Sequence, residues 1–174
     1  MARIAMIVGE DFEDSEFRVP YDRLREAGHE VIVVGTERGR PLAGKQGKEK
    51  ATPDHAIDDV SADEVDALVI PGGYSPDHLR TNRKMVELTR RVFDAGKPVA
   101  AICHAGSMLA EADVVRGLAL TSWPSIRTDL VNAGARWVDR EVVEDGNLIT
   151  SRKPDDLAAF TAAILRHLGG PAAV

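Results

Sequence analysis

With 174 residues, the chain is long enough to bury a hydrophobic core, and we expect residues 1–174 to form a single domain. Hydrophobic residues make up 44% and charged residues 29% of the chain, which is typical of a globular protein. No run of 18 or more apolar residues occurs, so no transmembrane helix and no membrane partner are expected. The net charge of −6 argues against a nucleic-acid-binding surface. A single cysteine and the absence of a signal-peptide pattern favour a cytoplasmic location.

Short apolar runs alternate with helical patterns along the whole chain. Residues 4–8, 30–34, 67–70 and 99–102 form continuous apolar segments, as expected of parallel strands buried on both faces. Helical spacing predicts one helix that begins within residues 9–16 and runs to residue 27, and others at 82–95 and 155–168. Helical residues are also expected after residue 106, to about residue 115. Pro20 is expected to kink or split the first helix. Small hairpins are expected within residues 35–60 and 142–151. The alternation predicts an α/β sandwich with a mostly parallel central sheet.

The turn after the first strand is acidic, with five acids in residues 9–16. Carboxylates there would repel a pyrophosphate, so a dinucleotide cofactor is not expected. Most of these acids are interpreted as complements to the helix dipole, although the turn lies at the carboxyl end of a central strand, where open α/β sheets place their sites. His55 lies near Asp54, Asp58 and Asp59, but an exposed loop is the simpler interpretation, and no metal site is predicted.

The segment 97–106 contains the only cysteine, Cys103, directly between an apolar strand and a helix-compatible stretch. Such a junction forces a sharp turn and places one side chain near backbone N–H groups and a positive helix end. Those groups favour a thiolate, which suggests a nucleophile. A buried cysteine acting as a small hydrophobic residue is the alternative from this segment alone.

A cysteine nucleophile needs a proton acceptor, and histidine is scarce in this chain. Downstream of Cys103 there are only His104 and His167, so a conventional distant histidine is poorly supplied. The remaining candidates are His104 itself, His78 from the preceding loop, or an acid such as Glu13. Two glycines follow the strand at 67–70, and the backbone N–H of Gly73 is a candidate donor to an oxyanion.

Four segments in the same order resemble the PfpI family, which includes enzymes named intracellular proteases, glyoxalases of the cofactor-free type and deglycases. They are residues 67–73 (ALVIPGG), 101–104 (AICH), 132–135 (NAGA) and 150–156 (TSRKPDD). The resemblance covers nearly the whole chain. It implies a flavodoxin-like three-layer sandwich with a nucleophile elbow, and a cysteine enzyme that needs no cofactor.

The resemblance also implies roles for individual residues. Cys103 is the nucleophile with His104 beside it, and Glu13 corresponds to the acid that hydrogen-bonds the cysteine. Asp77 corresponds to an acid that reaches His104 across a subunit boundary, which implies a homodimer or a hexamer built from dimers. The backbone N–H groups of Gly73 and His104 would form the oxyanion hole. The chain departs from the usual Cys-His-Gly-Pro pattern because Ala105 and Gly106 follow His104, which puts the substrate range in doubt.

The leading functional hypothesis is a stress-related enzyme in which the Cys103 thiolate attacks reactive carbonyls such as methylglyoxal or early glycation adducts. Peptide hydrolysis is a related alternative. A redox sensor or chaperone-like protein is the alternative from another class, because an exposed thiolate without a resolving cysteine oxidises to sulfenic and sulfinic acid. A receiver domain is disfavoured because the strand at 67–70 ends in Pro71-Gly72 rather than in a phosphorylatable aspartate.

Overall fold

The computed structural model describes residues 1–169 and has a seven-stranded sheet at its centre. The strand order is β10-β11-β7-β6-β1-β2-β5, and every neighbouring pair is parallel except β10 with β11. The strands are β1 (Arg3–Ile7), β2 (Glu30–Gly35), β5 (His55–Ala56), β6 (Ala67–Ile70), β7 (Val99–Ile102), β10 (Val143–Asp145) and β11 (Leu148–Ser151). The predicted mostly parallel α/β sandwich is confirmed.

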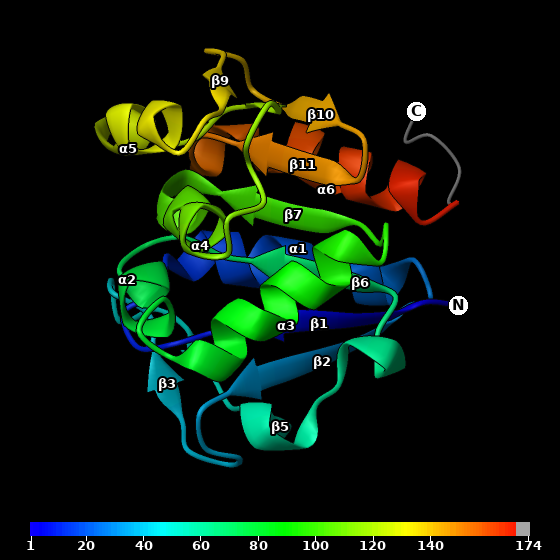
Figure 1. The fold of residues 1–174 in the computed structure, drawn as a ribbon. Helices are drawn as coiled ribbons and strands as arrows, with labels where there is room; N and C mark the ends of the chain where they lie inside the picture. Colours follow the sequence, from blue (N-terminus) through cyan, green and yellow to red (C-terminus); the bar gives the residue numbers. More distant parts are fainter. Residues whose placement is uncertain (170–174) are drawn as a thin grey trace.

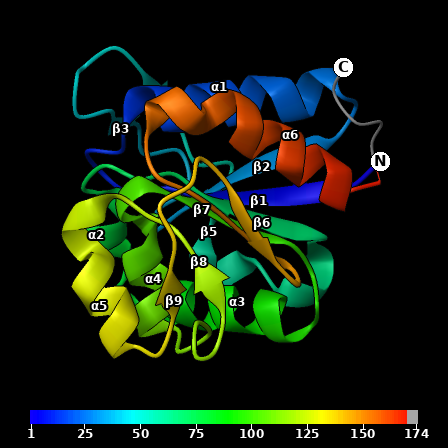
Figure 2. The ribbon, with the colours of Figure 1, turned by 90° about the horizontal axis from the view of Figure 1, so that it is seen from above.

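Helices cover both faces of this sheet (Figures 1 and 2). One face is covered by α1 (Asp14–Glu26) and α6 (Leu157–His167), and the other by α2 (Ser75–Leu79), α3 (Arg83–Asp94), α4 (Gly106–Glu111) and α5 (Arg127–Asn132). The three layers match the expected flavodoxin-like arrangement. Within residues 1–169, no helix is both long and apolar enough to cross a membrane.

The strands pack on both faces, which explains their continuous apolar sequences. In β1, Ile4 and Met6 pack with α1 and α6, whereas Ala5 and Ile7 pack with the helices of the opposite face. All four side chains are fully buried. A strand that alternates between two hydrophobic cores needs apolar residues at every position, so the pattern distinguishes the central strands from the sheet edges.

Two small sheets lie outside the main one. The first, β3 (Leu42–Ala43) with β4 (Lys50–Ala51), is antiparallel and is the hairpin expected within residues 35–60. The second pairs β8 (Ala119–Leu120) with β9 (Arg136–Trp137) in parallel. The hairpin β3–β4 matters for function because its connecting loop reaches the carboxyl edge of the main sheet.

Two helix boundaries differ from the sequence-based expectations. Helix α1 runs as one element through Pro20, so the expected split is absent. Helix α4 ends at Glu111 rather than near residue 115, and Asp113 adopts a left-handed backbone conformation just beyond it. A residue at positive φ ends a helix as effectively as a glycine does, and sequence alone does not reveal it at an aspartate.

Candidate active site

Three neighbouring strands end at one edge of the sheet and bring distant segments together. The acidic turn follows β1, the Pro71-Gly72-Gly73 turn follows β6, and Cys103 follows β7. Because β1, β6 and β7 are adjacent and parallel, their carboxyl ends lie side by side. A backbone hydrogen bond of 3.1 Å from Glu13 N to Gly72 O joins the first two turns.

The elbow at Cys103 is present, and its backbone is strained. Cys103 has φ of 63°, a left-handed conformation that side chains with a Cβ seldom adopt, and a short 3₁₀ turn (Cys103–Ala105) leads into α4. Trp123 N donates to Cys103 O at 3.1 Å and fixes the turn from the other side. The backbone N–H groups of Gly73 and His104 lie near the Cys103 sulfur and lower the pKa of the thiol. The predicted nucleophile and both predicted oxyanion-hole donors therefore come together.

The Glu16 side chain supplies the carboxyl group that packs next to the Cys103 thiol. Its side chain is completely buried, and its Oε1 accepts a 2.9 Å hydrogen bond from Gly72 N. A Cβ on Gly72 would lie 2.5 Å from Glu16 Oε1 and 2.7 Å from Cys103 Cβ, so the two side chains converge where only glycine fits. Within residues 1–169, Glu16 Oε2 has no hydrogen-bond partner, and the nearby Cys103 thiol lowers the pKa of this carboxyl group.

Burial dominates the ionisation of this pair. Burial first, and then the charge of Glu13, raise the pKa of Glu16 to about 8, against the lowering effects of the Gly72 N–H, Lys45 and Cys103. Burial and the negative charge of Glu16 raise the pKa of Cys103 to about 12, whereas the His104 and Gly73 N–H groups and Lys45 lower it. The sequence predicted a lowered thiol pKa, in part from the helix end and the backbone donors. Those donors are present, but desolvation and the neighbouring carboxylate outweigh them when Glu16 is ionised.

Glu13 lies in a different environment from the one predicted. Its Oε2 pairs with Lys45 Nζ at 2.8 Å, and its Oε1 accepts from Gln46 Nε2 at 2.9 Å. Glu13 is the residue immediately before α1, whereas Glu16 lies inside the helix on the buried stripe that continues with Pro20 and Leu24. The contact with the thiol expected of Glu13 therefore belongs to Glu16. The signal in the sequence was the i, i+4, i+8 spacing of Glu16 with these buried residues.

His104 is half-buried in the turn that follows Cys103. Its ring lies 6.4 Å from the ring of Trp123, centroid to centroid. Burial and the nearby positive charge of Lys45 lower the pKa of His104, so the imidazole is neutral at pH 7 and can accept a proton. Among the predicted bases, His104 directly follows Cys103 in the sequence. Its neutral imidazole is the form that can accept a proton.

Two other predicted residues lie on α2. Asp77 is exposed there, and its expected role concerns His104 of a second copy. His78 lines a separate cavity of about 230 Å³ together with residues that include Glu10 and Arg40. Cys103 does not line that cavity, which disfavours His78 as the base.

Sequence analysis missed Lys45 and Gln46, both in the loop that joins β3 to β4. Besides its pair with Glu13, the Lys45 ammonium group lies 5.7 Å from the ring centroid of Tyr74, an exposed residue that follows Gly73. Residues 44–49 are glycine-rich and polar, and nothing in their pattern indicates that they reach an edge formed by other strands. The position of residues 44–49 depends on contacts with residues far away in the sequence.

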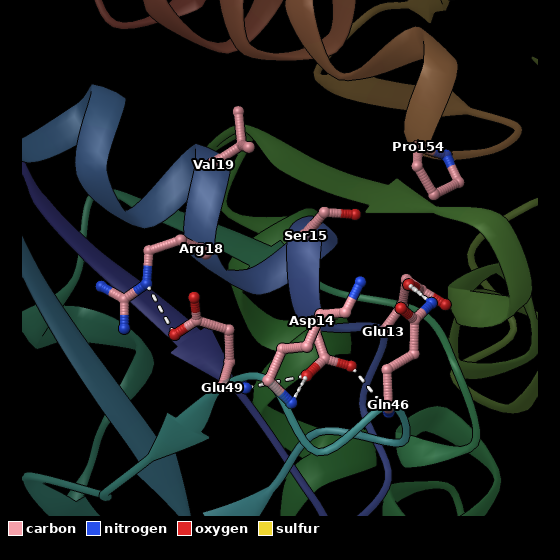
Figure 3. Close-up of a pocket in the computed structure, with 9 residues that line it drawn as sticks. Glu13, Asp14, Ser15, Arg18, Val19, Gln46, Glu49 and Pro154 are labelled. Atoms are coloured by element: carbon pink, nitrogen blue, oxygen red, sulfur yellow. Dashed lines mark hydrogen bonds and ion pairs between the residues drawn. The ribbon is translucent and has the colours of Figure 1, made fainter.

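A cavity of about 360 Å³ adjoins this region (Figure 3). Glu13 forms part of its wall, and the remaining walls come from the start of α1, the 46–49 stretch and Pro154. In the part of the chain that the structure describes, no group of three or more His, Cys, Asp or Glu side chains is arranged to hold a metal ion.

Comparison with known proteins gives one consistent match. Residues 2–167 match the DJ-1/PfpI family. The chain is 49% identical to "Protein/nucleic acid deglycase 2" of Escherichia coli over 96% of this chain and 98% of that protein. It is 45% identical to "Deglycase PfpI" of Pyrococcus furiosus (95% and 99%) and 46% identical to "General stress protein 18" of Bacillus subtilis (95% and 97%).

Solved structures agree with the sequence relatives. Drosophila melanogaster DJ-1beta superimposes with a TM-score of 0.90 at 34% identity, covering 97% of this chain and 91% of that one. A two-domain protein of Anabaena variabilis with DJ-1/ThiJ/PfpI-like and ferritin-like domains superimposes with a TM-score of 0.96 at 42% identity, covering 98% of this chain and 49% of that one.

Proposed function

Because this chain belongs to the DJ-1/PfpI family, we propose that it is a cofactor-independent cysteine enzyme that removes α-oxoaldehyde adducts from amines and thiols. Relatives that are 45–49% identical along almost their entire length are named deglycases, which supports this activity. The observation that carries the proposal is the position of Cys103 in a left-handed turn at the end of β7, packed against the buried carboxyl group of Glu16. The Gly73 and His104 N–H groups lower the pKa of its thiol there.

The proposed roles follow from the ionisation of the site. With a pKa of about 8, Glu16 is mostly protonated at pH 7, and a protonated carboxyl group can donate a hydrogen bond to a thiolate. In that state Glu16 also lacks the negative charge that raises the pKa of Cys103. The protons of the pair are coupled, so the thiolate form is the minor but reactive one.

The chemistry needs neither an oxidant nor a reductant. In an adduct of methylglyoxal with an amine, the Cys103 sulfur forms a bond to the former aldehyde carbon, the carbon–nitrogen bond breaks, and the amine leaves with a proton. The resulting hemithioacetal isomerises when a base moves the proton from that carbon to its neighbour and the hydroxyl proton passes to the oxygen of that neighbour, which gives a thioester of lactate. Water hydrolyses the thioester and restores the thiol. His104 is proposed as the base, and the Gly73 and His104 N–H groups as donors to the developing oxyanion.

The proposal extends to location and assembly. A reducing cytoplasm would keep the catalytic thiol reduced. A homodimer, or a hexamer built from dimers, would allow Asp77 of one copy to approach His104 of another, as the family resemblance implies. Asp77 is exposed on α2, which is compatible with that arrangement.

The test compares a preformed adduct with free methylglyoxal. A peptide modified by methylglyoxal is incubated with wild type and with Cys103→Ala, and lactate and unmodified peptide are both quantified. An excess of an amine trap that removes free aldehyde distinguishes the two substrates. Lactate formation that continues in the trap and requires Cys103 supports deglycation. Lactate formation that the trap abolishes identifies free aldehyde as the substrate and overturns the adduct assignment.

The two alternatives have their own signatures in the same samples. Cleavage of the peptide backbone, absent in Cys103→Ala, would identify a peptidase. Absence of any turnover, with Cys103 converted to sulfinic acid by mild peroxide, would favour a redox sensor.

A further inference from the structure

The loop of residues 44–49 wraps around one buried carboxylate, that of Asp14. Asp14 Oδ1 accepts from Gln46 N at 2.9 Å, and Oδ2 accepts from Lys48 N and from Glu49 N, each at 2.9 Å. Asp14 is only 4% exposed, and these contacts span more than 30 residues in sequence. Figure 3 shows the carboxylate pointing into the loop from the start of α1. Burial raises the pKa of Asp14, but the backbone donors outweigh it and the net pKa is lowered, so the carboxylate remains charged.

The loop fits this carboxylate closely. A Cβ on Gly44 would overlap Asp14 Oδ2, so no side chain fits at position 44 without displacing the carboxylate or the loop. Lys45 N donates to Phe12 O at 2.9 Å and ties the loop to the turn after β1. Three side-chain hydrogen bonds and one glycine thus define the path of the backbone through residues 44–49.

The same loop delivers two side chains toward the Cys103 site. The adjacent residues Lys45 and Gln46 hold both oxygens of Glu13. The titratable groups around the thiol are Glu16 from α1, His104 from the elbow and Lys45 from the loop, with Glu13 as the ion-pair partner of Lys45. Lys45 is the only cation in this set when His104 is neutral.

We propose that Asp14 is a positioning residue that fixes the 44–49 loop and thereby holds the Lys45 ammonium group beside Cys103 and Glu16. The inference rests on the proposed function for its catalytic meaning. Its physical content, the control of the thiol's charge by a remote carboxylate, can be measured without turnover. Removal of a cation from the Cys103–Glu16 pair raises both macroscopic pKa values, so the thiolate forms at higher pH.

The experiment measures the rate of Cys103 alkylation by iodoacetamide as a function of pH in Asp14→Asn, Lys45→Met and the double variant. Asparagine keeps one acceptor oxygen but turns an N–H₂ group toward backbone donors, so the loop loosens. We expect both single variants to shift the midpoint of the profile upward and to slow alkylation at pH 8. The shift for Lys45→Met should be at least as large. Asp14→Asn should add nothing in the Lys45→Met background, because its effect passes through Lys45.

Asp156→Asn is the matched control. Asp156 is 2% exposed and accepts hydrogen bonds from the backbone and guanidinium groups of Arg152, so its loss removes another buried carboxylate. It should lower the thermal midpoint without moving the alkylation profile. The proposal is overturned if Asp14→Asn lowers only the thermal midpoint, or if its shift persists in full in the Lys45→Met background.

Gly44→Ala keeps the proposal testable if Asp14→Asn does not fold. This change retains the Asp14 charge and forces the loop and the Asp14 carboxylate apart, so it should shift the profile in the same direction. An unchanged profile in a folded Gly44→Ala protein would contradict the proposal. Alkylation measures only the reactivity of the thiol. A wild type without deglycase activity would overturn the proposed function, whereas the alkylation profiles would still decide whether Asp14 positions Lys45.

Discussion

The elbow at Cys103 and the 44–49 loop are both irregular segments at the carboxyl edge of the sheet, but they are held in different ways. The elbow follows a strand buried between β6 and β11, and its strained residue is held on both sides by regular structure. The loop joins two strands of two residues each, and one buried carboxylate organises it. The elbow therefore holds the Cys103 thiol in a fixed position, whereas the position of the Lys45 charge depends on a loop that one substitution at Asp14 can loosen.

The largest expected effect separates chemistry from folding at the elbow. Cys103→Ala should reduce lactate formation by about 10³-fold or more, because it removes the proposed nucleophile. The free energy of unfolding should change by less than about 1 kcal/mol, since alanine experiences the same left-handed backbone cost. Steady-state kinetics and chemical denaturation measure the two quantities. Substantial activity in this variant would exclude Cys103 as the nucleophile.

Gly72→Ala should damage both stability and activity. The new Cβ would overlap Glu16 Oε1 and Cys103 Cβ, so one of them must move. We expect a loss of about 1–3 kcal/mol in stability from overpacking and a fall in activity of about 10²-fold from the displaced site. Gly96→Ala is the control, because Gly96 has positive φ and open space around its Cβ position. It should cost stability and leave the rate unchanged. Full activity in Gly72→Ala would contradict the tight packing of the thiol against Glu16.

Glu16→Gln should change how stability depends on pH. The pKa of Glu16 is raised from 4.5 to about 8 in the folded protein, so the folded state keeps a proton that the unfolded state releases between these values. The contribution of Glu16 to stability is fully present below pH 4.5 and is lost as pH rises through about 8. The difference in unfolding free energy between wild type and Glu16→Gln should fall over this range by at most about 1.4 kcal/mol per pH unit. Parallel curves for the two proteins would show that the carboxyl group is not perturbed.

The smallest effect is expected at Asp77, which lies outside both segments. Asp77→Ala should reduce activity a few-fold, and only at protein concentrations where subunits assemble, since its proposed partner is His104 of another copy. Activity measured across a dilution series, with sedimentation velocity on the same samples, tests this. An equal loss in a protein that is monomeric throughout would contradict the role across a subunit boundary.

The sequence by itself determined the fold class and singled out Cys103 as the candidate nucleophile. Continuous apolar strands, helical spacing and a lone cysteine at a strand–helix junction are local signals, and local sterics and burial act on neighbouring residues. Gly73 was also singled out because two glycines follow a buried strand, whereas the role of the His104 N–H group came from the family resemblance.

Only the tertiary structure decided that Glu16 is the acid packed against the thiol and that Lys45 is the nearby cation. Glu13 and Glu16 are three residues apart in one acidic turn, and the rotation of α1 against the sheet selects Glu16. Lys45 reaches the site because Asp14 folds a distant loop around itself. The ionisation of the thiol then depends on burial and on charges from remote segments. Burial and the charges of distant segments act together only after the chain has folded, so no local sequence pattern reveals their combined effect on the thiol pKa.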